Sequence, residues 1–158
     1  MARKTDEFYL FWNGFCSQWD KCTFNLDGVQ YNCAEQAMMH KKALQFGDTK
    51  TAEKILKAKQ PSVQKGLGRQ VSNYDDAVWS ANRYDIVIDI NEAKFSQNPK
   101  LLKQLLALDD LTIVEASPYD KIWGIGLGES HPHATIPSKW KGLNLLGKAL
   151  MEVRDTLK

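Results

Sequence analysis

The chain has 158 residues and a formal net charge of +2; 25% of its residues are charged and 43% are hydrophobic. These values are ordinary for a folded protein, and the length suits one domain with its own core. No apolar run approaches the roughly 20 residues of a membrane span. The N-terminal residues lack the apolar core of a secretion signal, which predicts a cytosolic protein. The small charge suits a phosphorylated ligand, but it does not mark a nucleic-acid-binding protein.

The three cysteines, Cys16, Cys22 and Cys33, lie in the first quarter of the chain. Their odd number and the lack of a CxxC pair argue against a disulfide framework, and no histidine stands near them at a zinc-binding spacing. They are therefore predicted to be free thiols in a reducing compartment.

The N-terminal part predicts strands followed by a helix. Residues 8–12 are aromatic and apolar, as expected of a strand. An Asp27-Gly28 pair between two short alternating stretches predicts a hairpin, because both turn positions need positive φ. A helix is then predicted from about Cys33 to Phe46, with Asn32 and Glu35 in the spacing of a capping box.

Helical patterns dominate the rest of the chain. Asp48 and Pro99 are placed as helix starts, and the predicted helices span residues 48–59, a short piece before Gly66, 75–94, 99–106 and about 142 to the end. Within the third of these, residues 86–88 also fit a strand. The last helix carries an apolar stripe that consists of Leu143, Leu146, Leu150, Val153 and Leu157.

Two segments near the C-terminus depart from this helical pattern. Residues 111–115 are apolar and β-branched and predict a strand, whereas 122–127 fit either a second strand or a tight loop, because glycine recurs there. The following loop contains His131 and His133, which lack a third metal ligand at a useful spacing and are predicted to be exposed. The sequence therefore predicts an α+β fold: a single, compact, mainly helical domain over 1–158 with a small sheet and a core at about 8–157.

Three separated blocks of sequence resemble the NADAR (YbiA-like) family. The first runs from FYLFWNGFCSQW to the AEQAMMHKKALQFGD helix, the second joins Gly68-Arg69 to Trp79 and Lys94-Phe95, and the third consists of VEASPYDKIWGIGL and WKGLNLLGKALMEVRDTL. Together they cover nearly the whole chain in the family's order. Two positions depart from the family's pattern: Ala37 stands where an aromatic residue is common, and Cys16 where Pro-Phe often precedes Ser-Gln-Trp.

This resemblance implies a compact α+β fold and hydrolysis of the bond between a ribose and a nitrogenous base. The substrates it implies are phosphoribosylamino-pyrimidines of riboflavin biosynthesis, or ADP-ribose attached to guanine in nucleic acid. The expected partner is thus a small ribosyl molecule or an ADP-ribosylated nucleic acid, with no membrane. No metal or organic cofactor is required by this chemistry.

Breaking a ribose C1–N bond passes through an oxocarbenium-like state, so negative charge near C1 and help for the departing base are needed. Glu35 matches the family's glutamate and is the leading catalytic candidate, although its position also fits a helix-capping partner. Lys42 lies two helical turns later, about 10 Å along the axis, and matches the family's lysine. It is expected to bind phosphate or to attack C1 of an opened ribose. Lys41 is the competing assignment.

Asp120 is the second expected carboxylate, either as an acid or base beside a glycine-rich segment or as a turn former after Ser-Pro. The remaining candidates would bind substrate. Trp12, Trp19 and Trp123 are expected to form an aromatic wall, and the Arg69 guanidinium to bind a phosphate. The backbone at Gly124 would allow a ligand to approach closely, and Asn144 would supply a polar group at the start of the last helix. Core packing of Trp123 and simple capping by Asn144 are the structural alternatives. Glu115 and Arg154 are weaker candidates.

A rival reading from another class is a non-catalytic module that binds ADP-ribose or NAD-like ligands. Such a module would keep Trp123, the glycines and Arg69, but it would not need both Glu35 and Lys42. The presence of both residues favours the enzyme.

Overall fold

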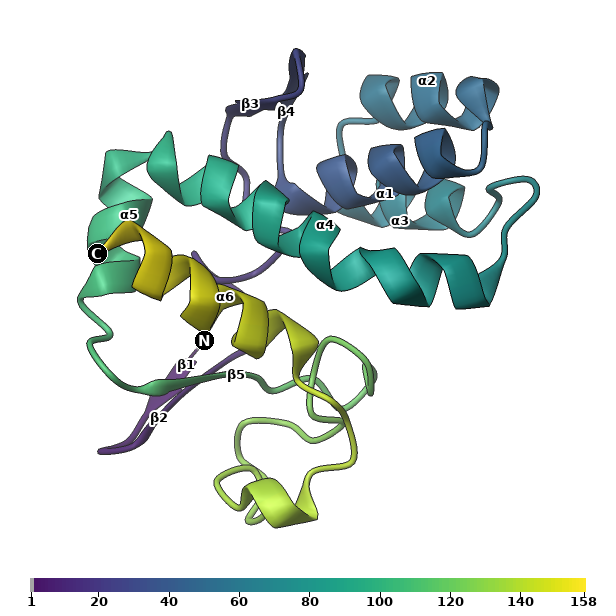
Figure 1. Ribbon diagram of the computed structural model, residues 1–158. Helices are drawn as coiled ribbons and strands as arrows, with labels where there is room; N and C mark the ends of the chain where they lie inside the picture. Colours follow the sequence, from purple (N-terminus) through teal and green to yellow (C-terminus); the bar gives the residue numbers. More distant parts are fainter. Residues whose placement is uncertain (1) are drawn as a thin grey trace. The chain divides into compact units, whose positions relative to one another are not determined.

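The computed structural model describes residues 2–158, and it confirms the α+β fold. Within these residues there are six α-helices, five short strands and one 3₁₀ helix (Figure 1). The chain divides into two compact units, one made of the residues up to Asp20 with Pro99–Lys158, and the other of Lys21–Asn98. A single domain over the whole chain stays a prediction. No helix of residues 2–158 is long and apolar enough to cross a membrane.

The first unit is built on a three-stranded sheet. Its strands are β1 (Ala2–Lys4), β2 (Phe8–Phe11) and β5 (Thr112–Glu115), in the order β1-β2-β5. β2 pairs antiparallel with β1 and parallel with β5, so residues from both ends of the chain meet in one sheet. β1 was not expected from the sequence. Its side chains are exposed, and its strand conformation comes from backbone pairing alone.

Helices α5 (Pro99–Leu106) and α6 (Leu145–Leu157) belong to the same unit, and α6 packs against β5. The prediction of α5 is confirmed at both ends, but α6 begins three residues later than predicted. The cause is a left-handed Asn144, with φ of 52°, whose backbone N–H donates to the Gly124 carbonyl instead of continuing a helix. Leu143 is therefore exposed and lies outside the apolar stripe of α6.

A loop-rich layer completes the core of this unit. Leu10 and Val114 of the sheet pack with Ile125, Leu127 and neighbouring small residues in one buried cluster. Residues 122–127 are thus a tight loop, buried at Gly124, Ile125 and Leu127, rather than a second strand. The loop that follows contains only the short η1 helix (Pro137–Lys139).

The second unit begins with the predicted hairpin and continues as a helical layer. Strands β3 (Phe24–Leu26) and β4 (Val29–Tyr31) pair antiparallel, and both turn residues have positive φ, 52° at Asp27 and 79° at Gly28. The helices are α1 (Ala34–Gln45), α2 (Thr49–Lys57), α3 (Pro61–Gly68) and α4 (Asp76–Ser96). Residues 86–88 lie inside α4, so the strand alternative there is wrong.

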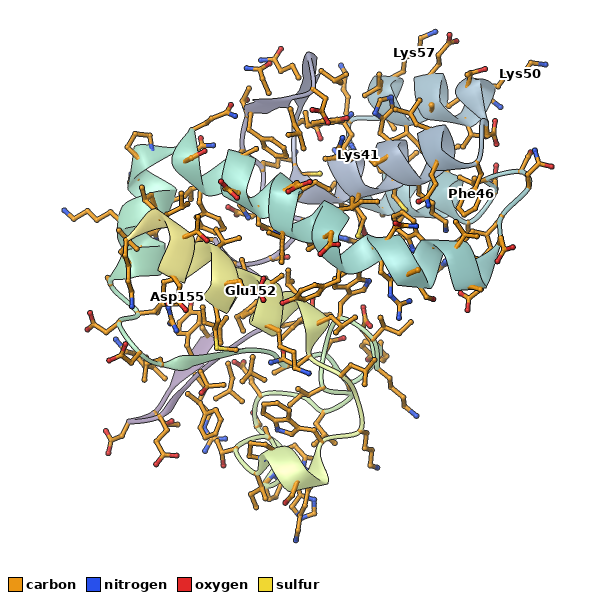
Figure 2. The ribbon with its side chains drawn as sticks, viewed as in Figure 1. Lys41, Phe46, Lys50, Lys57, Glu152 and Asp155 are labelled. Carbon is orange, nitrogen blue, oxygen red and sulfur yellow. The ribbon has the colours of Figure 1, made fainter. Side chains whose placement is uncertain are left out.

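Helix α1 is the central element of this unit. It contacts α2, α3 and α4 (Figure 1). Its residues 34–40 are all buried. Some charged residues of the other helices lie in solvent, among them Lys50 and Lys57 of α2 and Glu152 and Asp155 of α6 (Figure 2). The helix that carries Glu35 is therefore held rigidly by its neighbours.

The N-terminal cap of α1 differs from the predicted one. The Gln36 N–H donates to Cys33 Sγ at 3.4 Å, and Gln36 Oε1 accepts the Asn32 N–H at 2.8 Å. The cap is therefore formed by Cys33 and Gln36, one residue later than the predicted pair of Asn32 and Glu35, so the predicted capping box is wrong. Because Gln36 performs the capping, the carboxylate of Glu35 is not needed for it. The three cysteines are free thiols, as predicted.

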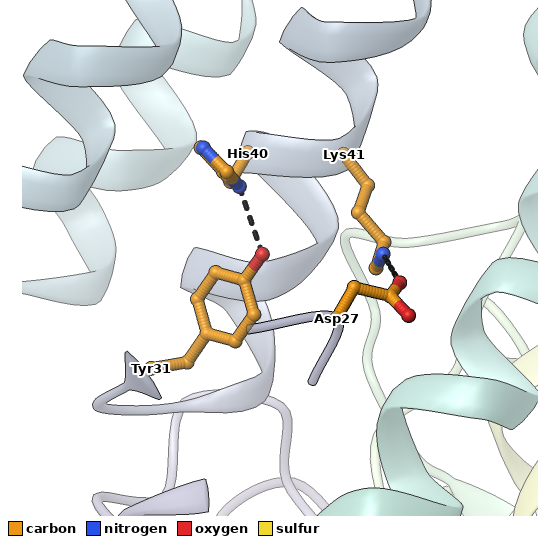
Figure 3. Close-up of polar contacts among 4 residues, drawn as sticks. All are labelled: Asp27, Tyr31, His40 and Lys41. Atoms are coloured by element: carbon orange, nitrogen blue, oxygen red, sulfur yellow. Dashed lines mark hydrogen bonds and ion pairs between the residues drawn. The ribbon is translucent and has the colours of Figure 1, made fainter. Parts of the chain in front are cut away.

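His40 is buried in α1 and shares a hydrogen bond of 2.8 Å with the Tyr31 hydroxyl through Nδ1 (Figure 3). Burial lowers the pKa of His40, and the neighbouring Lys41 lowers it further. Burial also raises the pKa of Tyr31 to about 12, so this hydroxyl keeps its proton. The pair is therefore a neutral contact that ties α1 to β4.

A pH-dependent contribution to stability follows from this contact. The pKa of His40 in the folded protein lies below its ordinary value of 6.5, so the unfolded chain binds this proton first as the pH falls. The contribution is present above that value and is lost as the pH falls through the folded pKa. We expect the free energy of unfolding to decrease less between about pH 7 and pH 5.5 in His40→Gln than in the wild type. Denaturant titrations at both pH values measure this difference, and equal decreases in the two proteins would contradict it.

Candidate functional site

Glu35 occupies the first turn of α1, where its side chain is only 5% exposed. A buried carboxylate needs compensating partners, and the N-terminus of a helix favours negative charge. Helix α1 is contacted by α2, α3 and α4, and this packing buries its first turn. The structure therefore places an acidic group on the buried face of a helix. Burial of a carboxylate costs desolvation free energy, so such groups are common at functional sites.

Lys42 lies two turns further along α1 and is half-buried. Burial lowers the pKa of the Lys42 ammonium; Glu35 and Asp76 oppose this shift, and Arg69 adds to it. Lys42 Nζ also lies 4.6 Å from the centroid of the Tyr74 ring. A carboxylate, two cations and an aromatic face are thus close enough to influence one another within this unit.

Lys41 points elsewhere. Its Nζ forms an ion pair of 2.6 Å with Asp27 Oδ2 on the β3–β4 turn (Figure 3). The helical phase of α1 therefore directs Lys42, not Lys41, to the side of Glu35 and Tyr74. Lys42 is the lysine that the geometry favours for the site.

Arg69 ends α3 and is exposed to solvent. The preceding residue Gly68 is buried against α1, where an added Cβ would lie 2.0 Å from Met39 Sδ. This close packing of α3 on α1 is what brings the Arg69 guanidinium near the Lys42 ammonium. Two neighbouring cations, one of them exposed, form a natural binding site for a phosphate group.

Tyr74 is a member of this cluster that the sequence reasoning missed. Its hydroxyl donates to Asp76 Oδ1 at 2.7 Å, and its ring lies 5.4 Å from that of Phe46 at an edge-on angle. Burial, aided by Asp76, raises the pKa of Tyr74 to about 12. No periodicity marks a residue in the connection between α3 and α4, so only the packing reveals it.

The other candidates lie in the first unit. Asp120 Oδ1 accepts the N–H groups of Ile122 and Trp123 at 2.9 and 2.8 Å, which closes the turn between β5 and the buried loop. This is the turn-forming arrangement that the Ser-Pro context suggested, and it fixes the backbone of the half-buried Trp123. Gly124 is required here, because an added Cβ would lie 2.9 Å from the Asp120 carbonyl oxygen. A catalytic role for Asp120 stays a prediction.

Asn144 is buried, and its amide bridges α6 to β5. Its Oδ1 accepts the Glu115 N–H and its Nδ2 donates to the Ile113 carbonyl, both at 3.0 Å. Both ends of the side chain thus make contacts within the fold, and the expected contact of Asn144 with a ligand stays a prediction. The tryptophans of the aromatic opening, Trp12 and Trp19, are both largely exposed.

The weaker candidates have structural contacts. Arg154 is buried in α6, where its guanidinium donates to the Leu111 carbonyl at 2.8 Å. His131 and His133 lie with ring centroids 5.0 Å apart, but within residues 2–158 no group of three or more possible metal ligands gathers.

Together, the fold and the cluster define a small α+β protein with a buried carboxylate and a lysine on one helix face. A family model for the NADAR domain matches residues 7–158, and the chain belongs to this family. An N-glycosidase of Acanthamoeba polyphaga mimivirus is 46% identical over 144 residues, which cover 88% of this chain and 85% of the viral protein. The resemblance seen in the sequence is thereby confirmed.

Two further relatives extend this comparison. A riboflavin biosynthesis protein of Vibrio vulnificus is 30% identical over 145 residues, covering 92% of this chain but only 36% of the longer bacterial protein. The NMR structure of the Escherichia coli protein YbiA superposes with a TM-score of 0.79 over 98% of this chain and 87% of YbiA, at 28% identity. The fold is thus shared with YbiA across nearly the whole chain.

Proposed function

We propose that this protein is an N-glycosidase, a hydrolase that cleaves the C1–N bond between a ribose and a nitrogenous base. The observation that carries the proposal is the buried Glu35 on the same face of α1 as Lys42. The viral relative named as an N-glycosidase supports it over most of the chain. An oxocarbenium-like transition state is positively charged, and a preorganised carboxylate stabilises such a state in a site shielded from water.

In the proposed reaction, the C1–N bond breaks as the oxygen of a water molecule bonds to C1. Glu35 stabilises the positive charge that develops on the ribose and accepts the proton of the attacking water. The electron pair of the broken bond leaves with the base, whose nitrogen takes up a proton. The role of Asp120 as a second carboxylate stays a prediction from the sequence. Water is the only co-reactant, so the step balances without a cofactor.

A substrate with a phosphate on its ribosyl half fits the cations of the cluster. The positive charge of Arg69 lowers the pKa of Lys42, and a bound phosphate would relieve the repulsion between the two cations. Both a phosphoribosyl and an ADP-ribosyl group supply such an anion. The Vibrio relative is named for riboflavin biosynthesis, which supports including a phosphoribosylamino-pyrimidine among the substrates to be tested.

Mass spectrometry of released base tests the proposal. The purified protein is incubated with phosphoribosylaminouracil, NAD, ADP-ribose and DNA carrying ADP-ribosyl-guanine. Release from at least one of them is expected. No release from any, combined with tight binding of ADP-ribose, would instead identify a non-catalytic binding module.

A pair of adjacent lysines offers a matched test of the site. We expect Lys42→Met to lower kcat/KM about 100-fold or more, because it removes a charge-assisted contact to the substrate. Lys41→Met serves as the control and should stay near the wild type, since Lys41 is ion-paired with an exposed Asp27. Equal losses in the two variants, measured by initial rates of base release, would remove Lys42 from the site.

The two roles proposed for Lys42 are separable. If its amine attacks C1 of an opened ribose, the C1–N bond to the base breaks, the base leaves with a proton, and the ribose stays on Lys42 as a Schiff base that cyanoborohydride reduces to a stable adduct. If Lys42 binds phosphate, no adduct forms and the main effect of Lys42→Met is a higher KM. Peptide mass mapping after reduction distinguishes these outcomes.

A further inference from the structure

Two adjacent lysines of α1 are held in different ways. Lys41 Nζ forms its 2.6 Å ion pair with Asp27, so a carboxylate already accepts from that ammonium and balances its charge. Lys42 takes part in no ion pair among residues 2–158. Its Nζ lies 4.6 Å from the centroid of the Tyr74 ring instead. The face of an aromatic ring attracts an ammonium without neutralising it, so the charge of Lys42 stays available to a ligand.

The Tyr74 ring is fixed by contacts of its own. Its hydroxyl donates to Asp76 Oδ1 at 2.7 Å, and the ring lies edge-on to Phe46 with 5.4 Å between centroids. Phe46 is the C-terminal cap residue of α1, the helix that also carries Lys42 (Figure 2). Tyr74 therefore has a defined position beside the end of α1, although its side chain is partly exposed to solvent.

The backbone on either side of Tyr74 is tied to the neighbouring helices. The Ser72 N–H donates to Asp48 Oδ2 at 2.9 Å, which joins the connection to the start of α2. Asp75 caps the first turn of α4 by accepting two backbone N–H groups at 3.0 and 3.3 Å. The connection between α3 and α4 is thus anchored before and after Tyr74, so the ring is a fixed support for the lysine.

The charges around Lys42 act on its proton in opposite directions. Burial lowers the pKa of Lys42; Glu35 of α1 raises it, Arg69 at the end of α3 lowers it, and Asp76 of α4 raises it. The ring of Tyr74 attracts the charged form only, because the neutral amine carries no net charge for the ring to attract. The ring therefore favours the ammonium at a position where burial opposes it.

We infer that Tyr74 is a positioning residue for Lys42: its ring holds the lysine ammonium charged and in one place, with its N–H groups left for the substrate. The inference rests on the proposed function in one respect, namely that Lys42 contacts the substrate. Tyr74 acts through Lys42 and does not need to touch the reacting atoms. The contact between the ring and the ammonium exists without a substrate, so it can be measured by itself.

Titration of Lys42 tests the inference without turnover. The lysines are labelled by reductive methylation with ¹³C-formaldehyde, which keeps their charge, and the Lys42 NMR resonance is the one absent from Lys42→Arg. In Tyr74→Leu we expect this resonance to titrate at a lower pH than in the wild type, because the ring no longer favours the ammonium. Tyr74→Phe keeps the ring and should titrate close to the wild type. The Lys41 resonance is the internal control and should not change.

Kinetics on the substrate that the wild type accepts supply a second readout. Tyr74→Leu is expected to lower kcat/KM about two- to fivefold, the factor that corresponds to a cation–π contact at a partly exposed site, and Tyr74→Phe should restore it. In a Lys42→Met background, Tyr74→Leu should have no further effect, because Tyr74 acts through Lys42. Thermal unfolding shows whether the variants are folded, and Tyr74→Met replaces Tyr74→Leu if the leucine variant does not fold.

The contrary results are equally specific. A Lys42 resonance that titrates alike in the wild type and in a folded Tyr74→Leu would overturn the inference, and so would equal losses of kcat/KM with and without Lys42. If Lys42 titrates at a lower pH in Tyr74→Leu but the protein releases no base from any substrate, the contact stands and the glycosidase proposal fails. If base release depends on Glu35 and Lys42 while Tyr74→Leu changes neither readout, the inference fails alone.

Discussion

Glu35→Gln is expected to lower kcat for base release by at least about 100-fold, because a positioned acid or base typically contributes between 10² and 10⁴. The amide has nearly the same size as the carboxylate, but it carries no charge to stabilise the oxocarbenium-like state and accepts no proton from water. Since the amide still fits the buried position in the first turn of α1, KM should change far less than kcat. Initial rates measured on the substrate that the wild type accepts provide both constants.

The matched control is Glu53→Gln, which removes the same charge from an exposed position in α2. Its kcat should equal that of the wild type. Thermal unfolding of both variants checks that the Glu35 effect is not loss of structure. A Glu35→Gln protein that is folded and retains full kcat would remove Glu35 from the chemistry and leave the mechanism proposed above without its main residue.

Gly147→Ala is expected to destabilise the protein by about 3 kcal/mol, the upper range for overpacking a core. Gly147 lies in α6, where an added Cβ would lie 2.1 Å from the Ile113 carbonyl oxygen of β5 and 2.4 Å from Asn144 Nδ2. The obstructing carbonyl is rigid backbone in the sheet, so α6 must move away from β5 and strain the Asn144 bridge. For a chain of this length, such a loss lowers Tm by roughly 10 °C.

Gly66→Ala is the control for this substitution. Gly66 lies in α3 with no atom within 4 Å of an added Cβ among the described residues, so alanine should stabilise by up to about 1 kcal/mol through helix propensity alone. Denaturant titrations of the two variants give both free energies of unfolding. An unaltered stability of Gly147→Ala would mean that α6 does not pack on β5 as closely as described.

Local signals in the sequence predicted most of the elements. The Asp27-Gly28 turn and the start of α5 at Pro99 were identified correctly, because turn geometry and helix starts depend on a few adjacent residues. The cap of α1 was predicted one residue too early. Cysteine is a rare cap, and the Asn32 side chain has another contact, since Gln64 Nε2 donates to Asn32 Oδ1 from α3.

The candidate site was predicted in part. Glu35, Lys42 and Arg69 were chosen with the help of the family resemblance, and the structure places them in one unit, where Glu35 and Arg69 both act on the pKa of Lys42. Tyr74 was missed, since its contact with Lys42 joins the end of α1 to a connection with no pattern of its own. The structural role of Asn144 was also missed, because both ends of its amide contact β5, a segment about 30 residues away.

The sequence by itself determined the family, the α+β class and the residue types required for ribosyl chemistry, because motifs, periodicity and turn residues are properties of neighbouring positions. Only the tertiary structure decided that Lys41 binds Asp27 while Lys42 lies with Tyr74, and that Trp12 meets Tyr119. It also decided that residues 2–4 form a strand. Each of these depends on the direction of a side chain or on pairing between distant segments, and packing of the whole chain sets both.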